Sequence, residues 1–257
     1  MKKIGFLMMA LLAMLALLAA GCGGSQEAPK KAETEKVLRV GTEPAFAPFE
    51  FQKEGFTGFD MDLIRAIGTK LGYKVEISSM GFDALIPALN SGNIDVAIAG
   101  MSITDERKKV VVFSDPYYTS GLIVMVKKDD DTIKGFSDLE GKRIAVQIGT
   151  TGANKAGEVK NAKVTAFNDN TAAAMELKNG GADAVINDSP VLKYYLQQGG
   201  SADAKVVGAV MNSEDYGIAV KKGNDKLAAE INKALAEMKQ NGEYDKLYKT
   251  WFGEEKK

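Results

Sequence analysis

The sequence of 257 residues contains no histidine and one cysteine, Cys22. The absence of histidine excludes the Ser-His-Asp and Cys-His catalytic arrangements and every metal site that uses an imidazole ligand. A lone cysteine cannot form an intramolecular disulfide or a cysteine cluster. No cofactor motif is present in the sequence, and no metal site is predicted. Many common enzyme mechanisms are therefore excluded before any motif is considered.

The chain also lacks an excess of charge of either sign. Lysine and arginine number 33, aspartate and glutamate number 34, and the net charge is −1. Binding to nucleic acid is therefore not expected, because there is no strong basic field to hold phosphates. Hydrophobic residues make up 45% and charged residues 26% of the chain, which excludes wholesale disorder and collagen-like repeats. At about 100–150 residues per domain, the length predicts two small domains.

The long apolar run of the sequence lies at its start. After Lys2 and Lys3, residues 4–20 are apolar and are interrupted only by Gly5. This run is slightly shorter than the ~20 residues that a membrane-spanning helix needs. A positive start, an apolar middle and small residues at the end are typical of a secretory signal peptide. We therefore expect residues 1–21 to be a signal peptide, with an uncleaved membrane anchor as the alternative.

The end of this run, Leu18-Ala19-Ala20-Gly21-Cys22, resembles the lipobox of bacterial lipoproteins. The resemblance implies cleavage before Cys22 and attachment of lipid chains such as palmitate, which hold the protein on the membrane. Residues 22–36 contain nothing that can bury apolar surface, so we expect a flexible tether there. The predicted location is the outer face of the bacterial cytoplasmic membrane or the periplasm.

The rest of the chain alternates strand-like and helix-like segments, and it does so twice. The expected strands are residues 37–42, 75–77, 94–99, 143–148, 164–167, 184–187 and 216–220. Apolar residues at helical spacing predict helices at 58–71, 82–90, 171–178, 190–197, 225–239 and 243–252. This order predicts an α/β fold in which each unit is a mostly parallel sheet flanked by helices.

A weak internal repeat supports two similar units. Leu89, Gly92, Asp95 and Ile98 recur 88 residues later as Leu177, Gly180, Asp183 and Ile186. Each copy gives a helix, a glycine stop, an aspartate and an apolar strand. Because ligands of open α/β sheets collect beyond the carboxyl ends of the strands, two such sheets facing each other would form a cleft. Chance similarity of two βα units is the alternative.

Four stretches carry specific motifs. They are residues 38–51, Gly58-Phe59-Asp60, Thr104-Asp105-Glu106-Arg107 and Phe113-Ser114-Asp115-Pro116-Tyr117-Tyr118. Together they resemble the bacterial extracellular solute-binding proteins of family 3, which are the amino-acid-binding components of ABC importers. The similarity runs from about residue 38 to residue 253 and looks closest to the glutamine-binding branch. It implies a two-lobed, type II periplasmic-binding-protein fold and capture of a free L-amino acid.

The charges of a free amino acid determine which residues its binding site needs, whatever the family. A free amino acid carries an ammonium and a carboxylate, and each loses hydration on entering a cleft, so each needs a charged or multiply hydrogen-bonded partner. Arg107 suits the carboxylate, because its planar fork can donate two parallel hydrogen bonds. Asp188, at the end of an expected strand, suits the ammonium. Backbone N–H groups near Ser102 and Thr151 are further donors for the carboxylate.

The resemblance extends this set. It implies that Phe46 and Phe82 sandwich the ligand side chain and that Glu43 contacts its far end. The full expected set of ligand-binding residues is Glu43, Phe46, Phe82, Ala99, Gly100, Ser102, Arg107, Gln147, Thr150, Thr151, Asn187 and Asp188.

The chain departs from the glutamine-binding branch at several of these positions. Gln147 stands where lysine is typical, Asn187 where histidine is typical and Thr151 where glycine is typical, while Glu43 replaces the usual aspartate. Loss of two potential cations next to an acidic residue makes the pocket more negative and favours a cationic side chain. Overall similarity therefore predicts glutamine, and the pocket charge predicts a basic amino acid such as arginine, lysine or histidine as the close second choice.

The implied mechanism is a clamp. Lobe 1 would be residues 37–118 with 217–257 and lobe 2 residues 124–211, with hinge strands at 119–123 and 212–216. The ligand bridges Arg107 on one lobe and Asp188 on the other and stabilises the closed form, which docks on an ABC permease with its ATPase. The protein is expected to be a monomer.

The sequence leaves two alternative functions open. One is an enzyme, since relatives with this fold include dehydratases of small carboxylates, for which Arg107 would anchor the carboxylate and Glu43 would donate the proton. The other is a ligand-sensing domain. The lack of histidine and of a cofactor motif makes us expect a binding protein and not an enzyme.

Overall fold

The computed structural model of this protein describes residues 35–253. The predicted signal peptide, the lipidation site Cys22 and the tether up to residue 34 lie outside the described residues. Within residues 35–253, no helix combines the length and the hydropathy that crossing a bilayer requires.

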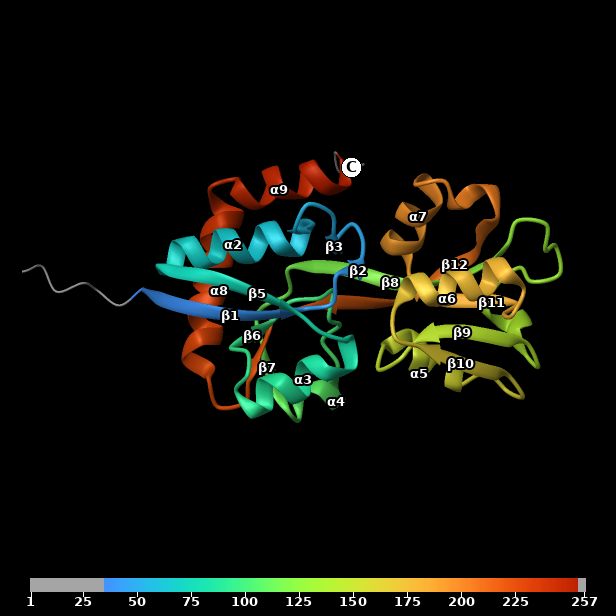
Figure 1. The fold of residues 1–257 in the computed structure, drawn as a ribbon, viewed down its shortest axis with the longest axis horizontal. Helices are drawn as coiled ribbons and strands as arrows, with labels where there is room; N and C mark the ends of the chain where they lie inside the picture. Colours follow the sequence, from blue (N-terminus) through green and yellow to red (C-terminus); the bar gives the residue numbers. More distant parts are fainter. Residues whose placement is uncertain (1–34, 254–257) are drawn as a thin grey trace, which may run out of the picture. The chain divides into compact units, whose positions relative to one another are not determined.

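Lobe 1 is built on a five-stranded sheet in the order β5-β1-β6-β13-β7 (Figure 1). Its strands are β1 (Lys36–Thr42), β5 (Tyr73–Ser79), β6 (Val96–Ala97), β7 (Val111–Phe113) and β13 (Ala219–Lys221). Strand β1 is parallel to β5 and β6, whereas β13 is antiparallel to both of its neighbours. Four of the five strands therefore run in one direction, and the late strand β13 runs against them.

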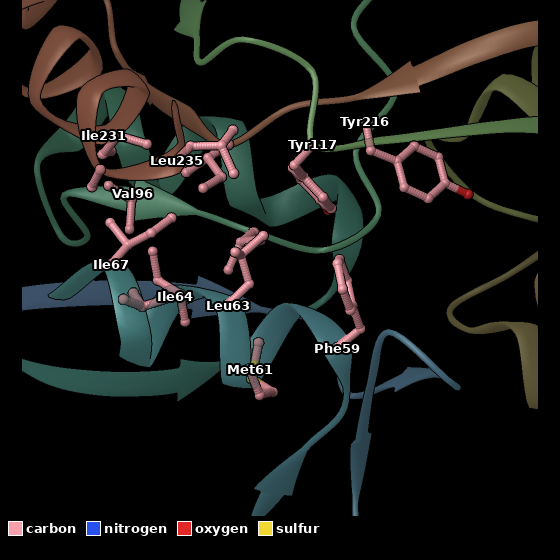
Figure 2. Packing of buried hydrophobic residues seen from close by; sticks show 14 of the residues in the cluster. Phe59, Met61, Leu63, Ile64, Ile67, Val96, Tyr117, Tyr216, Ile231 and Leu235 are labelled. Atoms are coloured by element: carbon pink, nitrogen blue, oxygen red, sulfur yellow. The ribbon is translucent and has the colours of Figure 1, made fainter. Parts of the chain in front are cut away.

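Helices cover both faces of this sheet. They are α2 (Phe59–Leu71), α3 (Phe82–Ser91) and α8 (Asp225–Gln240), with a short α4 (Asp105–Lys108) after β6. Helix α9 (Glu243–Phe252) packs on α2 and α8. On the face of α2 and α8, Leu63, Ile64 and Ile67 meet Val96, Ile231 and Leu235 (Figure 2). Ala97 and Ala219 pack with α3 on the other face. Successive strand residues alternate between the two cores, as the pleat requires.

Lobe 2 is built on a second five-stranded sheet in the order β10-β9-β11-β8-β12. Its strands are β8 (Tyr118–Lys127), β9 (Arg143–Gln147), β10 (Lys163–Phe167), β11 (Ala184–Asp188) and β12 (Ala204–Tyr216). The helical segments are α5 (Thr151–Gly157), α6 (Asn170–Asn179), α7 (Ser189–Gln197), η1 (Phe136–Leu139) and η2 (Gly200–Ala202). Here β8 is the strand that runs against the other four. The predicted two-lobed α/β fold is confirmed.

The chain passes between the lobes along β8 and returns along β12 (Figure 1). These strands pair antiparallel, with Ser120 opposite Glu214, Thr119 opposite Asp215 and Tyr118 opposite Tyr216. The predicted crossover segments 119–123 and 212–216 are thus parts of two longer strands. That they act as a hinge stays a prediction.

The strand expected at 216–220 is divided between the two sheets. Strand β12 ends at Tyr216 and β13 begins at Ala219. Gly217 lies at the change of sheet, where an added Cβ would come within 2.9 Å of two Ile103 side-chain atoms. A run of apolar residues does not show where a chain leaves one sheet for another, so the single predicted strand was wrong.

The internal repeat has a structural counterpart. In lobe 1, the Arg39 backbone N–H donates to Asp95 at 2.9 Å and its guanidinium donates to the Gly92 carbonyl at 2.7 Å. In lobe 2, Arg143 makes the same contacts with Asp183 and the Gly180 carbonyl, both at 2.8 Å. Each aspartate thereby ties the loop before its strand to the neighbouring strand.

A small sheet completes lobe 1 and was not predicted. It consists of β2 (Ala45–Phe46), β3 (Glu50–Gln52) and β4 (Phe56–Thr57), joined in sequence order. Strands of two or three residues are too short to show a periodic pattern in a sequence.

Candidate ligand-binding site

One small cavity gathers the residues that the sequence singled out. In the described part of the chain, its lining is Glu43, Phe46, Phe82, Ala99, Gly100, Ser102, Arg107, Gln147, Thr150, Thr151 and Asp188. All of these belong to the expected ligand-binding set. Glu43 and Ala99 follow β1 and β6 of lobe 1, and Gln147 and Asp188 end β9 and β11 of lobe 2. The cavity thus lies at the carboxyl ends of strands from both lobes, where such folds bind ligands.

Asn187 is the expected residue that the structure does not bring to this cavity. Its side-chain amide donates to Asn170 Oδ1 at 2.5 Å, and both side chains border a separate hollow beside α6 and α7. Asn187 and Asp188 are neighbours on β11, and successive side chains of a strand point to opposite faces. Since Asp188 faces the cavity, Asn187 faces away from it.

Arg107 joins the two lobes. Thr104 caps α4 by accepting from the Arg107 backbone N–H at 3.2 Å. The Arg107 guanidinium donates to the Ser102 carbonyl at 2.7 Å and to the Gly149 carbonyl of lobe 2 at 3.0 Å. It lies 5.1 Å from the centre of the Phe82 ring, which is cation–π distance. An arginine carries five N–H donors, so donors remain for a carboxylate in the cavity.

Asp188 provides a buried acidic group on the lobe 2 side. Its Oδ1 accepts from Ser120 Oγ at 2.8 Å and from the Tyr216 hydroxyl at 2.5 Å, and the residue is 6% exposed. Figure 2 shows this hydroxyl directed away from the side chains of α2. Burial is the main cause that raises the pKa of Asp188 to about 7, against its hydrogen bonds and the charge of Arg107. A cation placed beside Asp188 would favour its ionised form.

Glu43 provides a second buried acidic group on the cavity wall. It is 6% exposed, and burial raises its pKa to about 7. A hydrogen bond with the Gln147 side chain works in the opposite direction, and the charge of Asp169 raises the pKa further. The cavity therefore holds one guanidinium and two carboxyl groups. At both carboxyl groups, burial outweighs the hydrogen bonds that favour the ionised form, and at Asp188 it also outweighs the charge of Arg107.

Asp60 of the Gly58-Phe59-Asp60 motif supports the cavity wall from behind. Its Oδ2 accepts from the Gly100 backbone N–H at 2.9 Å and from the Tyr117 hydroxyl at 2.7 Å. Burial raises the pKa of Asp60 to about 6. Gly100 has φ +51°, and an added Cβ would lie 2.5 Å from Phe46 Cε1, so only glycine fits there. Motif residue Asp60 thus holds the backbone of Gly100, which lines the cavity.

Glu214 is a residue of the site that sequence reasoning missed. Its Oε2 accepts from Ser102 Oγ and from Thr151 Oγ1, both at 2.7 Å. Glu214 belongs to the segment predicted as a hinge, and no motif there indicates a contact with either hydroxyl.

Two α/β lobes that close a small polar cavity between the carboxyl ends of their strands define a solute-binding protein of the two-lobed, type II class. Among residues 35–253, no group of three histidine, cysteine, aspartate or glutamate side chains is placed to hold a metal ion. The model of the bacterial extracellular solute-binding proteins, family 3, matches residues 38–254, and the chain belongs to this family.

Relatives of known name cover nearly the whole chain. A probable histidine-binding protein of Campylobacter jejuni is 38% identical over 98% of this chain and 99% of its own length. An ABC transporter arginine-binding protein of Escherichia coli is 35% identical over 94% of this chain and 98% of its own. A solved structure of an ancestral arginine-binding protein bound to glutamine is 51% identical, with a TM-score of 0.80, over 86% of this chain and 99% of the other.

Proposed function

We propose that this protein is the substrate-binding component of an ABC importer and that it captures a cationic L-amino acid, with arginine as the first choice. The observation that carries the choice of ligand is the charge of the cavity. The charged residues of the lining are one cation, Arg107, and two acids, Glu43 and Asp188, so the lining has an excess of one acidic group. A cationic amino acid has a net charge of +1 and balances this excess.

Each charge of such a ligand has a counterpart in the cavity. The α-carboxylate would accept from the N–H groups of Arg107, and the α-ammonium would donate to Asp188. The cationic side chain would pass between Phe46 and Phe82 to Glu43. Charge-assisted hydrogen bonds contribute about 1.5–3 kcal/mol each. Two or three of them, less the cost of immobilising the ligand, are enough for micromolar binding at about −8 kcal/mol.

Glutamine is the second candidate, and a specific observation favours it. Because burial raises the pKa of Glu43 to about 7, much of this residue is protonated at neutral pH and can donate to a side-chain amide oxygen. A solved relative named as arginine-binding holds glutamine, which supports overlap between the two ligands in this family. The sequence-based first choice thus stays open as the alternative to arginine.

Delivery of the amino acid follows from the same proposal. Arg107 of lobe 1 already reaches the Gly149 carbonyl of lobe 2, so a ligand held by Arg107 and Asp188 would add contacts that exist only when the lobes are closed. The closed form would dock on an ABC permease with its ATPase. We further propose that lipid on Cys22 keeps the protein at the membrane surface, and that it acts as a monomer.

Calorimetric titration and thermal-shift screening with the standard amino acids test the proposal. The chain beginning at Gly23 retains every described residue and avoids the lipid. An amino acid present at one hundred times its Kd stabilises the folded state by about 2.7 kcal/mol. We expect arginine to give the largest shift and glutamine a smaller one. Absence of a shift with any amino acid, or turnover of a small carboxylate with release of water, would contradict the proposal.

A further inference from the structure

Glu214 forms a link between the two lobes. Its single oxygen Oε2 accepts the hydroxyl hydrogen bonds of Ser102, which belongs to lobe 1, and of Thr151, which belongs to lobe 2. Both hydroxyl residues line the ligand cavity, whereas Glu214 is not part of the lining. The carboxylate therefore lies behind the cavity wall and contacts it through these two hydroxyls.

Backbone pairing holds Glu214 in this place. Ser102 forms a β-bridge with Tyr216, and the Ile103 N–H donates to the Asp215 carbonyl at 2.7 Å. On the other side, Glu214 is paired with Ser120 of β8. The segment that carries Glu214 is thus fixed between the lobe 1 loop and the crossover strand, and its side chain is half-buried beside Ser102.

The direction of the two hydrogen bonds decides whether the hydroxyls of the cavity wall donate to a ligand or accept from it. A hydroxyl has one O–H donor and two lone pairs. When Ser102 and Thr151 donate to Glu214, only their lone pairs are left for the cavity. Lone pairs can accept hydrogen bonds from an ammonium, but they repel a carboxylate.

We propose that Glu214 is a positioning residue that makes Ser102 and Thr151 acceptors for the α-ammonium of the ligand. Glu214 thereby determines which groups of the cavity bind the α-ammonium and which bind the α-carboxylate of the amino acid. The α-carboxylate is left with N–H donors, of which Arg107 is the charged one, and the α-ammonium receives Asp188 together with the two oriented hydroxyls. The inference rests on the proposed function, because it concerns recognition of an amino acid in this cavity.

The arrangement also depends on closure. Ser102 and Thr151 come from different lobes, so one oxygen of Glu214 can accept from both only when the lobes are together. Orientation of the hydroxyls and closure of the cavity are therefore achieved in the same step.

The test compares L-arginine with its 2-hydroxy analogue, in which a hydroxyl replaces the α-ammonium. Both are titrated calorimetrically into the wild-type chain and into Glu214→Gln. The amide keeps the shape of the side chain but loses its charge and offers a donor of its own, so the hydroxyls are no longer held as acceptors. We expect L-arginine to bind at least tenfold more weakly to the variant, and the hydroxy analogue to change less than threefold.

Asp215→Asn is the matched control. Asp215 is the next residue on β12 and accepts from Thr119 Oγ1 at 2.7 Å, but it does not contact a cavity hydroxyl. This variant removes the same charge from the same strand, and we expect the preference for L-arginine over the analogue to stay within threefold of wild type. Equal weakening of both ligands by Glu214→Gln, or no weakening, would overturn the inference.

A second measurement covers the case in which Glu214→Gln folds poorly. In the double variant Ser102→Ala, Thr151→Val, the hydroxyls are gone, so the preference for the α-ammonium should fall at least tenfold with Glu214 still present. An unchanged preference would also overturn the inference. If wild type binds glutamine and not arginine, glutamine and its 2-hydroxy analogue replace the pair. A wild-type chain that binds no amino acid refutes the proposed function itself, before any variant is compared.

Discussion

Replacing Glu43 by glutamine is expected to stabilise the ligand-free protein at the expense of binding. The substitution removes a carboxyl group that is 6% exposed and keeps the size of the side chain. Burial raises the pKa of Glu43 from 4.5 to about 7, and each pH unit of such a difference corresponds to about 1.4 kcal/mol. Ionised Glu43 therefore destabilises the folded state by about 3 kcal/mol above pH 7.

The sign of the pH dependence follows from this shift. A carboxyl group with a raised pKa in the folded state binds more protons when folded, so its contribution to stability is present below its unfolded pKa and is lost as the pH rises through about 7. Wild type and Glu43→Gln should therefore have similar unfolding free energies near pH 4. At pH 8 the variant should be the more stable of the two by about 3 kcal/mol.

Binding should change in the opposite direction. A cationic side chain that pairs with Glu43 loses one charge-assisted hydrogen bond in the variant, which costs about 1.5–3 kcal/mol, or roughly ten- to hundredfold in Kd. Glutamine has no charge to lose there, so its affinity should change by less than threefold or improve.

Denaturant unfolding at pH 4 and pH 8, with calorimetric titration of L-arginine and L-glutamine, measures both effects. The reasoning is refuted if Glu43→Gln is not more stable than wild type at pH 8, since Glu43 would then not be a buried, uncompensated acid. It is equally refuted if the affinity for arginine is unchanged, because the far end of the cavity would then not recognise a cation.

Two further predictions concern the same cavity. Glu43 and Asp188 both have pKa values raised to about 7, so arginine binding should release protons. The affinity for arginine should fall as the pH drops below 7, by up to tenfold per pH unit for each group. Titrations in buffers of different ionisation enthalpy measure the proton release, and proton uptake would contradict the prediction. Gly100→Ala should weaken binding at least tenfold, because the added Cβ would lie 2.5 Å from Phe46 Cε1 at a backbone φ of +51°. Gly92→Ala is its control, with positive φ but nothing within 4 Å of the added Cβ.

The charged residues that line the cavity were named from the sequence for different reasons: Glu43 and Arg107 lie in specific motifs, and Asp188 ends an expected strand. That they bind a ligand stays a prediction. Arg107, Glu43 and Asp188 were each expected and meet at one cavity. The sequence did not show that Asn187 faces away from the cavity while Asp188 faces it. The phase of the strand decides which of two neighbouring side chains points to which face. That phase depends on how β11 pairs with β8 and β9, which is long-range information.

The contacts of Glu214 also could not be predicted from the sequence, because they too depend on long-range pairing. Its contacts with Ser102 and Thr151 span 112 and 63 residues of sequence and depend on pairing between a loop of one lobe and a crossover strand. The antiparallel placement of β13 and β8 in otherwise parallel sheets is also set by such pairing. Periodicity reports which residues are buried, but not which strand each element lies beside.

We propose above all that Arg107 and Asp188 bind the two head groups of one amino acid. Arg107→Ala measures it most directly in the thermal-shift screen, with Arg107→Lys as a variant that keeps the charge but not the planar fork, and with circular dichroism to establish folding. We expect Arg107→Ala to abolish the shift for every amino acid and Arg107→Lys to restore only part of it. A folded Arg107→Ala protein that keeps the wild-type shifts would contradict the claim.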